Sequence, residues 1–241
     1  MSAFLQIEGL AKHFGGFTAL DGVTLDIAQG ERFGLIGPNG SGKTTLINCI
    51  SGALLNDGGR IVFGGEEISR LPAYQRTRRG IARSFQIPRP FASMSVLENL
   101  VVPLEYVVHR HSLHTADTKA EAMAILKDMG LAAKAGTASS QLSQVELRKL
   151  ELARAMAARP KLLISDEAMA GLSGNEVSEV LEILFKLNAA GITIIMIEHI
   201  MQAVMKFSQR VVCLDAGKII CEGTPESIVQ DPEVQRAYLG A

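Results

Sequence analysis

Residues 37–44 read Gly37-Pro38-Asn39-Gly40-Ser41-Gly42-Lys43-Thr44, and this stretch decides the fold. It fits the phosphate-binding loop G-x-x-x-x-G-K-[ST], between an apolar segment typical of a strand and one typical of a helix. The glycines can take positive φ and let backbone N–H groups approach phosphate oxygens, to which a following helix adds its positive N-terminal end. The loop and the adjacent Thr45 predict a nucleotide site, in which Lys43 reaches the β- and γ-phosphates and the Thr44 hydroxyl binds Mg²⁺.

Short apolar runs rich in β-branched residues recur along the chain outside this loop. They occupy residues 32–37, 162–166, 192–197 and 210–215. Runs without polar alternation are typical of strands buried on both faces, as in a parallel sheet covered by helices. Between Asn175 and Ala190 apolar residues recur at helical spacing, and Gly191 follows as a stop signal. Helix and strand in alternation predict an α/β core with a mainly parallel sheet.

The first 65 residues carry a different pattern, which predicts a small antiparallel sheet. Segments 4–7 and 18–27 alternate between apolar and polar residues and are separated by the pairs Gly15-Gly16 and Asp21-Gly22, while Gly58-Gly59 and Gly64-Gly65 mark another hairpin.

From about residue 88 to residue 160 the pattern becomes helical and strand signals disappear. No linker divides the chain. We therefore expect a single domain over residues 1–241. Residues 1–87 and 160–241 would form its core together with the antiparallel subdomain, and residues 88–159 an inserted helical subdomain.

Two carboxylates end the apolar run 162–166 and form a second candidate site element. Asp166 is placed to hold Mg²⁺ through its water shell, and Glu167 to orient or deprotonate an attacking water. Two acids at a strand end are more often solvated. Downstream of a phosphate loop in a parallel sheet, however, a site for Mg²⁺ and the attacking water is the favoured interpretation.

With these motifs in this order, the chain resembles the ATP-binding subunits of ABC transporters along essentially its full length. The resemblance implies ATP and Mg²⁺ as cofactors. It implies that Phe14 stacks on adenine, that Gln86 contacts Mg²⁺ and water and links the core to the helical subdomain, and that His199 contacts the γ-phosphate and positions the hydrolytic water. Residues 170–173 stand where the family has the loop that crosses its dimer interface, with Ser173 at a position often filled by Asp or Asn.

Within the family, residues 81–91 and 167–172 look like the branched-chain amino-acid uptake branch. The resemblance therefore implies uptake of branched-chain amino acids or a similar small polar solute. One alternative is the ATPase subunit of a lipid or lipopolysaccharide exporter. A less favoured one is a soluble ABC ATPase acting on ribosomes or DNA. Such proteins usually carry two cassettes or a long coiled coil, whereas this chain has one cassette and no sustained heptads.

The family's signature, L-S-G-G-Q, is altered in this chain. It should fall at Leu142-Ser143-Gln144-Val145-Glu146, where both glycines are missing. The resemblance implies that Ser143 and the N–H groups of a helix N-terminus cap the γ-phosphate held by the opposite subunit. Gln144 and Val145 could obstruct that approach, and Glu146 brings a negative charge, although Ser143 and Glu146 also fit a capping box. Two readings stay open: a variant that still caps phosphate, and a weakened half-site that impairs the partner.

Charge and hydropathy limit the partners and the compartment. Lys and Arg number 24 against 25 Asp and Glu, so the net charge of -1 gives no general attraction to nucleic acid. Three cysteines without C-x-x-C spacing, no secretory signal and no bilayer-length apolar run predict a cytoplasmic protein. The resemblance implies that it is peripheral on the inner face of the cell membrane. The resemblance implies as partners transmembrane permease subunits, a second ATP-binding subunit of the same or another kind and, indirectly, a solute-binding protein.

Overall fold

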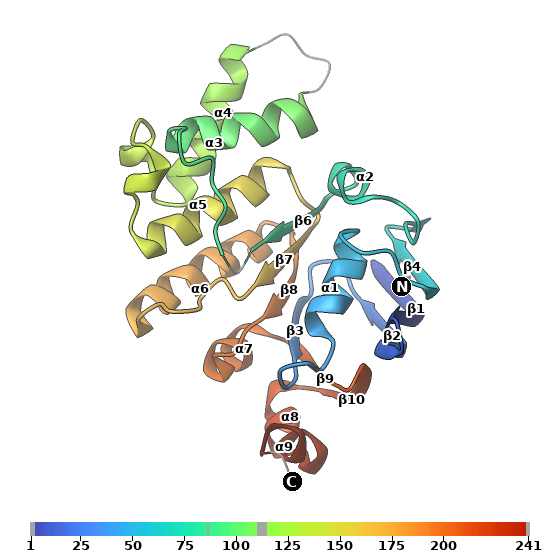
Figure 1. Cartoon of the computed structure of the whole chain (residues 1–241). Coiled ribbons are helices and arrows are strands. Elements are labelled where there is room, and N and C mark those ends of the chain that lie inside the picture. Colours follow the sequence, from blue (N-terminus) through green and yellow to red (C-terminus); the bar gives the residue numbers. More distant parts are fainter. Residues whose placement is uncertain (1–2, 86, 110–114, 240–241) are drawn as a thin grey trace.

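A twisted sheet of six strands forms the centre of the molecule in the computed structural model, which describes residues 3–85, 87–109 and 115–239 (Figure 1). The strand order is β10-β9-β3-β8-β7-β6. In chain order the strands are β3 (Arg32–Ile36), β6 (Ile81–Ser84), β7 (Leu162–Asp166), β8 (Thr193–Ile197), β9 (Arg210–Asp215) and β10 (Lys218–Gly223). The β9/β10 pair is antiparallel and the other neighbours are parallel. The predicted α/β core with a mainly parallel sheet is confirmed.

This sheet is covered on both faces and divides the hydrophobic core in two. Alternate residues of β8 enter different clusters: Ile194 and Met196 face one, Ile195 and Ile197 the other. The first cluster packs against α6 (Gly174–Ala189) and α7 (Met201–Phe207), and the second against α1 (Lys43–Ser51) and the N-terminal sheet. Burial on both faces explains why β3, β7, β8 and β9 read as apolar runs.

The N-terminal sheet is antiparallel, as predicted, with strand order β2-β1-β4-β5. Its strands are β1 (Leu5–Phe14), β2 (Phe17–Ile27), β4 (Gly58–Phe63) and β5 (Glu66–Glu67), and the turn at Gly15-Gly16 joins β1 to β2. The predicted break at Asp21-Gly22 is wrong, because that pair lies inside β2. Gly22 has φ 71°, and the register between β1 and β2 shifts nearby. The glycine therefore lies at an irregular point of the strand pairing and does not end the strand.

Gly58-Gly59 also begins a strand rather than forming a turn. A Cβ at Gly59 would lie 2.3 Å from the carbonyl oxygen of Gly9, so the glycine permits close approach of two strands. Gly64-Gly65 forms the predicted turn from β4 to β5.

The described residues between β6 and β7 form helices, turns and one isolated bridge, from Ser95 to Ala138. The helices are α3 (Val96–Pro103), the π-helical turn η1 (Leu104–Val108), α4 (Thr115–Asp128), the 3-10 turns η2 (Ala132–Lys134) and η3 (Ser139–Gln141), and α5 (Gln144–Ala157). α2 (Ala73–Arg78) precedes β6. The subdomain limits at residues 88 and 159 stay a prediction.

After β10 the chain ends in two short helices, α8 (Pro225–Gln230) and α9 (Pro232–Leu239). Across the described ranges, no helix is both long and apolar enough to traverse a bilayer.

Candidate functional site

The phosphate loop joins β3 to α1 and borders a cavity of about 260 Å³. Gly42 precedes the first residue of α1 with φ 107°, and a Cβ there would lie 2.6 Å from the carbonyl oxygen of Ala19. Only glycine fits this position without strain. No side chain in the described ranges caps the start of α1, so its first N–H groups are free to bind an anion.

Predicted residues from separate segments meet at this cavity. It is lined by Phe14, Phe17, Ala19, the loop residues Asn39, Gly40, Ser41, Gly42, Lys43, Thr44 and Thr45, and the more distant Glu167 and His199. Gly37 and Pro38 do not line it. Their carbonyl oxygens instead accept hydrogen bonds from Lys43 Nζ, at 2.7 and 2.9 Å.

Two observations show that the loop fits a phosphate group. Lys43 is only 8% exposed, and burial lowers the pKa of its ammonium group, an effect that the nearby Glu167 partly offsets. The hydroxyl of Ser41 is buried and lacks a hydrogen-bond partner within the described part of the chain. A buried cation beside an unsatisfied hydroxyl is suited to an anionic ligand with several oxygens.

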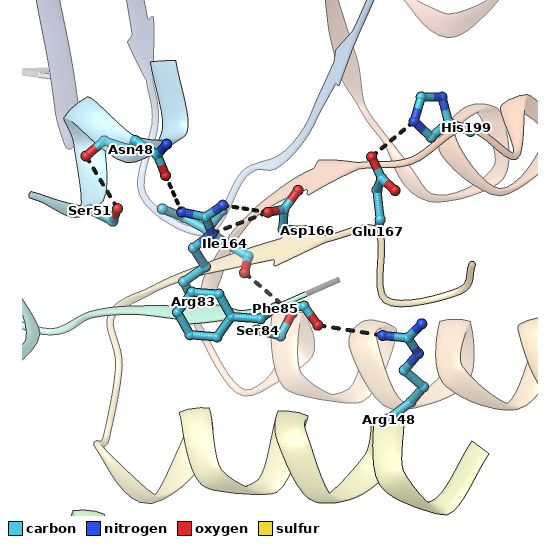
Figure 2. A network of polar contacts seen from close by, with 10 residues as sticks. All are labelled: Asn48, Ser51, Arg83, Ser84, Phe85, Arg148, Ile164, Asp166, Glu167 and His199. Atoms are coloured by element: carbon cyan, nitrogen blue, oxygen red, sulfur yellow. Dashed lines mark hydrogen bonds and ion pairs between the residues drawn. The ribbon is translucent and has the colours of Figure 1, made fainter. Parts of the chain in front are cut away.

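Asp166, at the carboxyl end of β7, is held by an arginine that the sequence did not single out for the site. Arg83 Nη2 lies 2.6 Å from Asp166 Oδ2, and Arg83 Nη1 donates to Asn48 Oδ1 at 2.6 Å (Figure 2). Arg83 comes from β6, which neighbours β7 in the sheet. The pair therefore joins β6, β7 and α1 beneath the phosphate loop.

Thr44 and Asp166 line a second, smaller cavity together with Glu167. A hydroxyl and a carboxylate are the oxygen donors that Mg²⁺ prefers, with substrate phosphates completing its shell. The two residues thus fit the predicted metal role. Gln86, the third predicted metal ligand, lies outside the described residues.

Glu167 and His199 are in direct contact, although neither lies inside a strand. His199 Nε2 lies 2.9 Å from Glu167 Oε1 (Figure 2). Glu167 has φ 47°, a strained value for a residue with a side chain, and its N–H donates to the carbonyl oxygen of Ile197 at 2.9 Å. The parallel ends of β7 and β8 thus bring together Glu167 and His199, two of the three predicted catalytic residues, the third being Lys43 of the phosphate loop.

An aromatic pair borders the open side of the cavity. Phe14 and Phe17 face each other across the first hairpin turn and are 47% and 62% exposed. The Lys12 ammonium lies 5.5 Å from the centre of the Phe14 ring. Exposed aromatic rings beside a phosphate loop can stack on a nucleobase. Phe17 was not predicted, and the signal that could have found it is its place directly after Gly15-Gly16.

The altered signature forms an intact helix start at α5, and Ser143 is not among the residues that line the phosphate-loop cavity. Ser143 and Glu146 make the predicted capping box, with bonds of 2.9 and 3.4 Å. Lys134 Nζ lies 2.6 Å from Glu146 Oε1, and the hydrogen bonds from Lys134 and Ser143 lower the pKa of Glu146. Val145 packs against the core and does not project into solvent. The carboxylate of Glu146 is bound by Lys134 and Ser143.

Gln144 and Arg148, both on α5, hold the loop that follows Glu167. The Gln144 amide donates to the carbonyl oxygen of Ala170 at 3.4 Å, and Arg148 Nη2 donates to the same atom at 3.2 Å. Arg148 Nη1 also reaches the carbonyl oxygen of Phe85, at 3.5 Å, in the segment that leads to residue 86 (Figure 2). The start of α5 is thus bound to two loops of the core.

Glu198 is a further buried carboxyl group at the site that the sequence did not single out. It is 3% exposed, and its Oε1 accepts the N–H of Met169 at 2.9 Å. Burial raises the pKa of Glu198 to about 7, and Glu167 and Asp166 add to that rise, whereas the Met169 N–H and Arg148 oppose it. The carboxyl group next to His199 therefore titrates close to neutral pH.

We expect the free energy of unfolding to fall as pH rises from about 5 to 8 through this group. Its pKa in the folded chain lies above the ordinary 4.5, so the folded state binds the proton more tightly, and this stabilisation is lost as pH rises through about 7. Glu198→Gln cannot ionise and should flatten this part of the curve, gaining about 1–2 kcal/mol over wild type at pH 8. Urea unfolding at pH 5, 6, 7 and 8 measures this. The exposed Glu182→Gln on α6 should keep the wild-type slope, and a wild-type slope in Glu198→Gln would contradict the expectation.

Comparison with known proteins agrees with this geometry. The family described as ABC transporter matches residues 20–170, and the one described as branched-chain amino acid ATP-binding cassette transporter matches residues 218–241. BraF of Pseudomonas aeruginosa and LivG of Escherichia coli, both named high-affinity branched-chain amino acid transport ATP-binding proteins, are 37% and 38% identical to this chain. Each match covers 98% of this chain and 97% of the relative.

Solved structures show the same fold. An ATP-binding cassette of an ABC transporter in its ADP conformation aligns over 100% of both chains, with a TM-score of 0.90 and 32% identity. A dimeric cassette in a post-hydrolysis state with ADP and Pi aligns over 92% of this chain and 98% of that one, with a TM-score of 0.82 and 25% identity. On these matches, which extend along nearly its whole length, the chain belongs to the ABC transporter family, among its ATP-binding subunits.

Proposed function

We propose that this chain binds Mg-ATP and hydrolyses it to power uptake of branched-chain amino acids or a similar small polar solute. It does so as a cytoplasmic subunit, peripheral on the inner face of the membrane beneath separate permease subunits. The observation that carries the proposal is the single cavity in which Lys43 and Thr44 face the contacting pair of Glu167 and His199. The solute class is supported by the match over residues 218–241 and by the names of the relatives.

The residues of this cavity fit attack of water on the γ-phosphate. Glu167 would accept the proton of the water, and His199, 2.9 Å from it, would hold the Glu167 carboxylate and the water in place. Lys43 would offset the charge that develops on the phosphate oxygens, and Phe14 would stack on the adenine. Thr44 and Asp166, with Gln86, would hold Mg²⁺, which supplies neutralisation of the β- and γ-phosphate charge.

We further propose that Ser143 acts on ATP held by a second ATP-binding subunit, either a copy of this chain or a related one. Ser143 does not line the cavity of its own chain, and it begins a helix whose positive end suits a phosphate. The likeness to a dimeric cassette supports this arrangement. A solute-binding protein would act indirectly through the permeases, and nucleic acid has no part in the function.

The test is ATP binding and hydrolysis by the purified chain as its own concentration rises. We expect Mg-ATP binding at all concentrations and a hydrolysis rate per molecule that rises cooperatively, because each site needs a second chain. Uptake of labelled leucine by vesicles containing the chain and its permeases then tests the solute. Absence of Mg-ATP binding would refute the ATPase role, and leucine uptake independent of ATP would refute the transport role.

The altered signature is expected to support hydrolysis as it stands. Val145 packs into the core, Gln144 turns to Ala170, and Lys134 neutralises Glu146, so the helix start stays open to phosphate. Gln144→Gly/Val145→Gly should change kcat by less than about fivefold, and two glycines in the first turn should lower stability by roughly 1–2 kcal/mol.

Steady-state hydrolysis and thermal melting of the double variant measure these two effects. The control is Gln144→Ala, which removes the contact with Ala170 and adds no backbone freedom. A gain of more than about tenfold in kcat from the glycines would show that the native side chains obstruct the partner's phosphate.

A further inference from the structure

The C-terminal helix touches the phosphate loop. The hydroxyl oxygen of Tyr238, on α9, accepts a hydrogen bond from the N–H of Gly37 at 2.8 Å. Figure 1 places α8 and α9, at the end marked C, beside the loop that leads from β3 into α1. The last turn of the chain thus meets the first residue of the nucleotide-binding motif.

Gly37 is the most tightly confined glycine of that loop. Its φ is 148°, and a Cβ would lie 2.0 Å from the carbonyl oxygen of Leu214 on β9. Its carbonyl oxygen accepts from Lys43 Nζ at 2.7 Å, and its N–H donates to Tyr238. Both polar groups of the Gly37 backbone are therefore engaged, one by the lysine that would bind phosphate and the other by the C-terminal helix.

The position of Tyr238 is set by the docking of α8 and α9, which carry Ile228 and Val234 respectively. Ile228 and Val234 are 0% and 5% exposed and belong to the main hydrophobic cluster. Asp231 Oδ1 accepts the N–H groups of Glu233 and Val234, at 2.8 and 3.1 Å, and so caps the start of α9. Val234 and Tyr238 are four residues apart and share one helical face. Packing of Val234 therefore orients Tyr238 toward the loop.

We propose that Tyr238 is a positioning residue of the ATP site, which fixes the Gly37 peptide and thereby holds the phosphate loop and Lys43 in the form that accepts ATP. The inference rests on the proposed ATPase function and assigns a role to the C-terminal segment that the branched-chain family match covers. Tyr238 does not line the cavity where water would attack. Its hydroxyl should therefore affect nucleotide affinity and leave the chemical step unchanged.

Tyr238→Phe removes the hydroxyl and keeps the ring, which is 43% exposed. We expect the Kd and the KM for Mg-ATP to rise about three- to tenfold, equivalent to about 0.6–1.4 kcal/mol, with kcat within about twofold of wild type. Titration with a fluorescent ATP analogue and steady-state hydrolysis measure the two effects. The matched control is Tyr74→Phe on α2, where the hydroxyl accepts a hydrogen bond from the neighbouring Gln75 at 3.1 Å, and all three constants should stay at wild-type values.

The split between KM and kcat separates positioning from plain stabilisation. A merely structural hydroxyl would lower the melting temperature of the nucleotide-free chain and leave Kd and KM unchanged, and that result would overturn the inference. So would a fall in kcat at constant KM. If wild type binds Mg-ATP in this titration and Tyr238→Phe binds it with the same Kd, the role of Tyr238 is refuted and the proposed function stands. Failure of wild type to bind Mg-ATP refutes both.

Discussion

Glu167→Gln should lower kcat for ATP hydrolysis by about 10²–10⁴-fold, because it removes the proposed general base. The amide is nearly the same size as the carboxylate and can keep a hydrogen bond to His199, which lies 2.9 Å away. The strained backbone at this position, φ 47°, is unaffected by the change. ATP affinity should therefore stay within about threefold of wild type. Single-turnover hydrolysis and nucleotide titration measure the two quantities.

The control for this substitution is Glu182→Gln, which makes the same chemical change on the exposed face of α6. It should hydrolyse ATP at the wild-type rate. If the assembled transporter hydrolyses ATP normally with Glu167→Gln, Glu167 is not the base. If the variant loses ATP binding as well, its role is in the structure of the loop rather than in the chemical step.

Lys43→Met should weaken ATP binding by at least about 30-fold and abolish measurable hydrolysis. Methionine preserves the length of the stem and removes charge-assisted hydrogen bonds to phosphate, which are worth about 1.5–3 kcal/mol each. Lys43 is 8% exposed and burial already lowers the pKa of its ammonium group, so an uncharged side chain is tolerated there. The melting temperature without nucleotide should shift by only a few degrees.

Isothermal titration with Mg-ATP and a melting curve test both parts of this expectation. Lys127→Met, on the exposed side of α4, makes the same change far along the chain and should leave affinity unchanged. Undiminished ATP affinity in Lys43→Met would show that the loop does not bind phosphate in the proposed manner. A collapsed melting curve would show that Lys43 supports the fold through Gly37 and Pro38.

The sequence was informative wherever the relevant physics is local. Strands β3, β7, β8 and β9 lie within a residue of the predicted runs, because burial on both faces leaves an unbroken apolar signature. The start of α5 was predicted through its capping box, which depends on two residues three positions apart. The break at Asp21-Gly22 was wrong because a glycine also suits an irregular point within a strand, and the local pattern is the same in both cases.

Contacts such as Arg83 with Asp166, between segments far apart in the chain, could not be predicted from local sequence patterns. Arg83 binds Asp166 because β6 and β7 are neighbours, yet 83 residues separate the two side chains. Tyr238 meets Gly37 across 201 residues, and Glu198 is buried because of what packs around it. Nothing in the residues next to Arg83 or Tyr238 indicates these partners. The strand order supplies the partner of Arg83 and the docking of α9 that of Tyr238, and a single sequence contains neither in readable form.

Asp166, the last residue of β7, and Glu167, which follows it, have different partners although they are neighbours in the chain. Asp166 turns to Arg83, and the next residue, Glu167, turns to His199. Since successive side chains of a strand point to opposite faces, inserting or deleting one residue in β7 would turn its buried side chains to the other face and displace both acids from their partners. A length change there would do more harm than most substitutions. The turn at Gly15-Gly16, by contrast, has no described atom within 4 Å of either glycine's missing side chain and could grow longer without disturbing the sheet behind it.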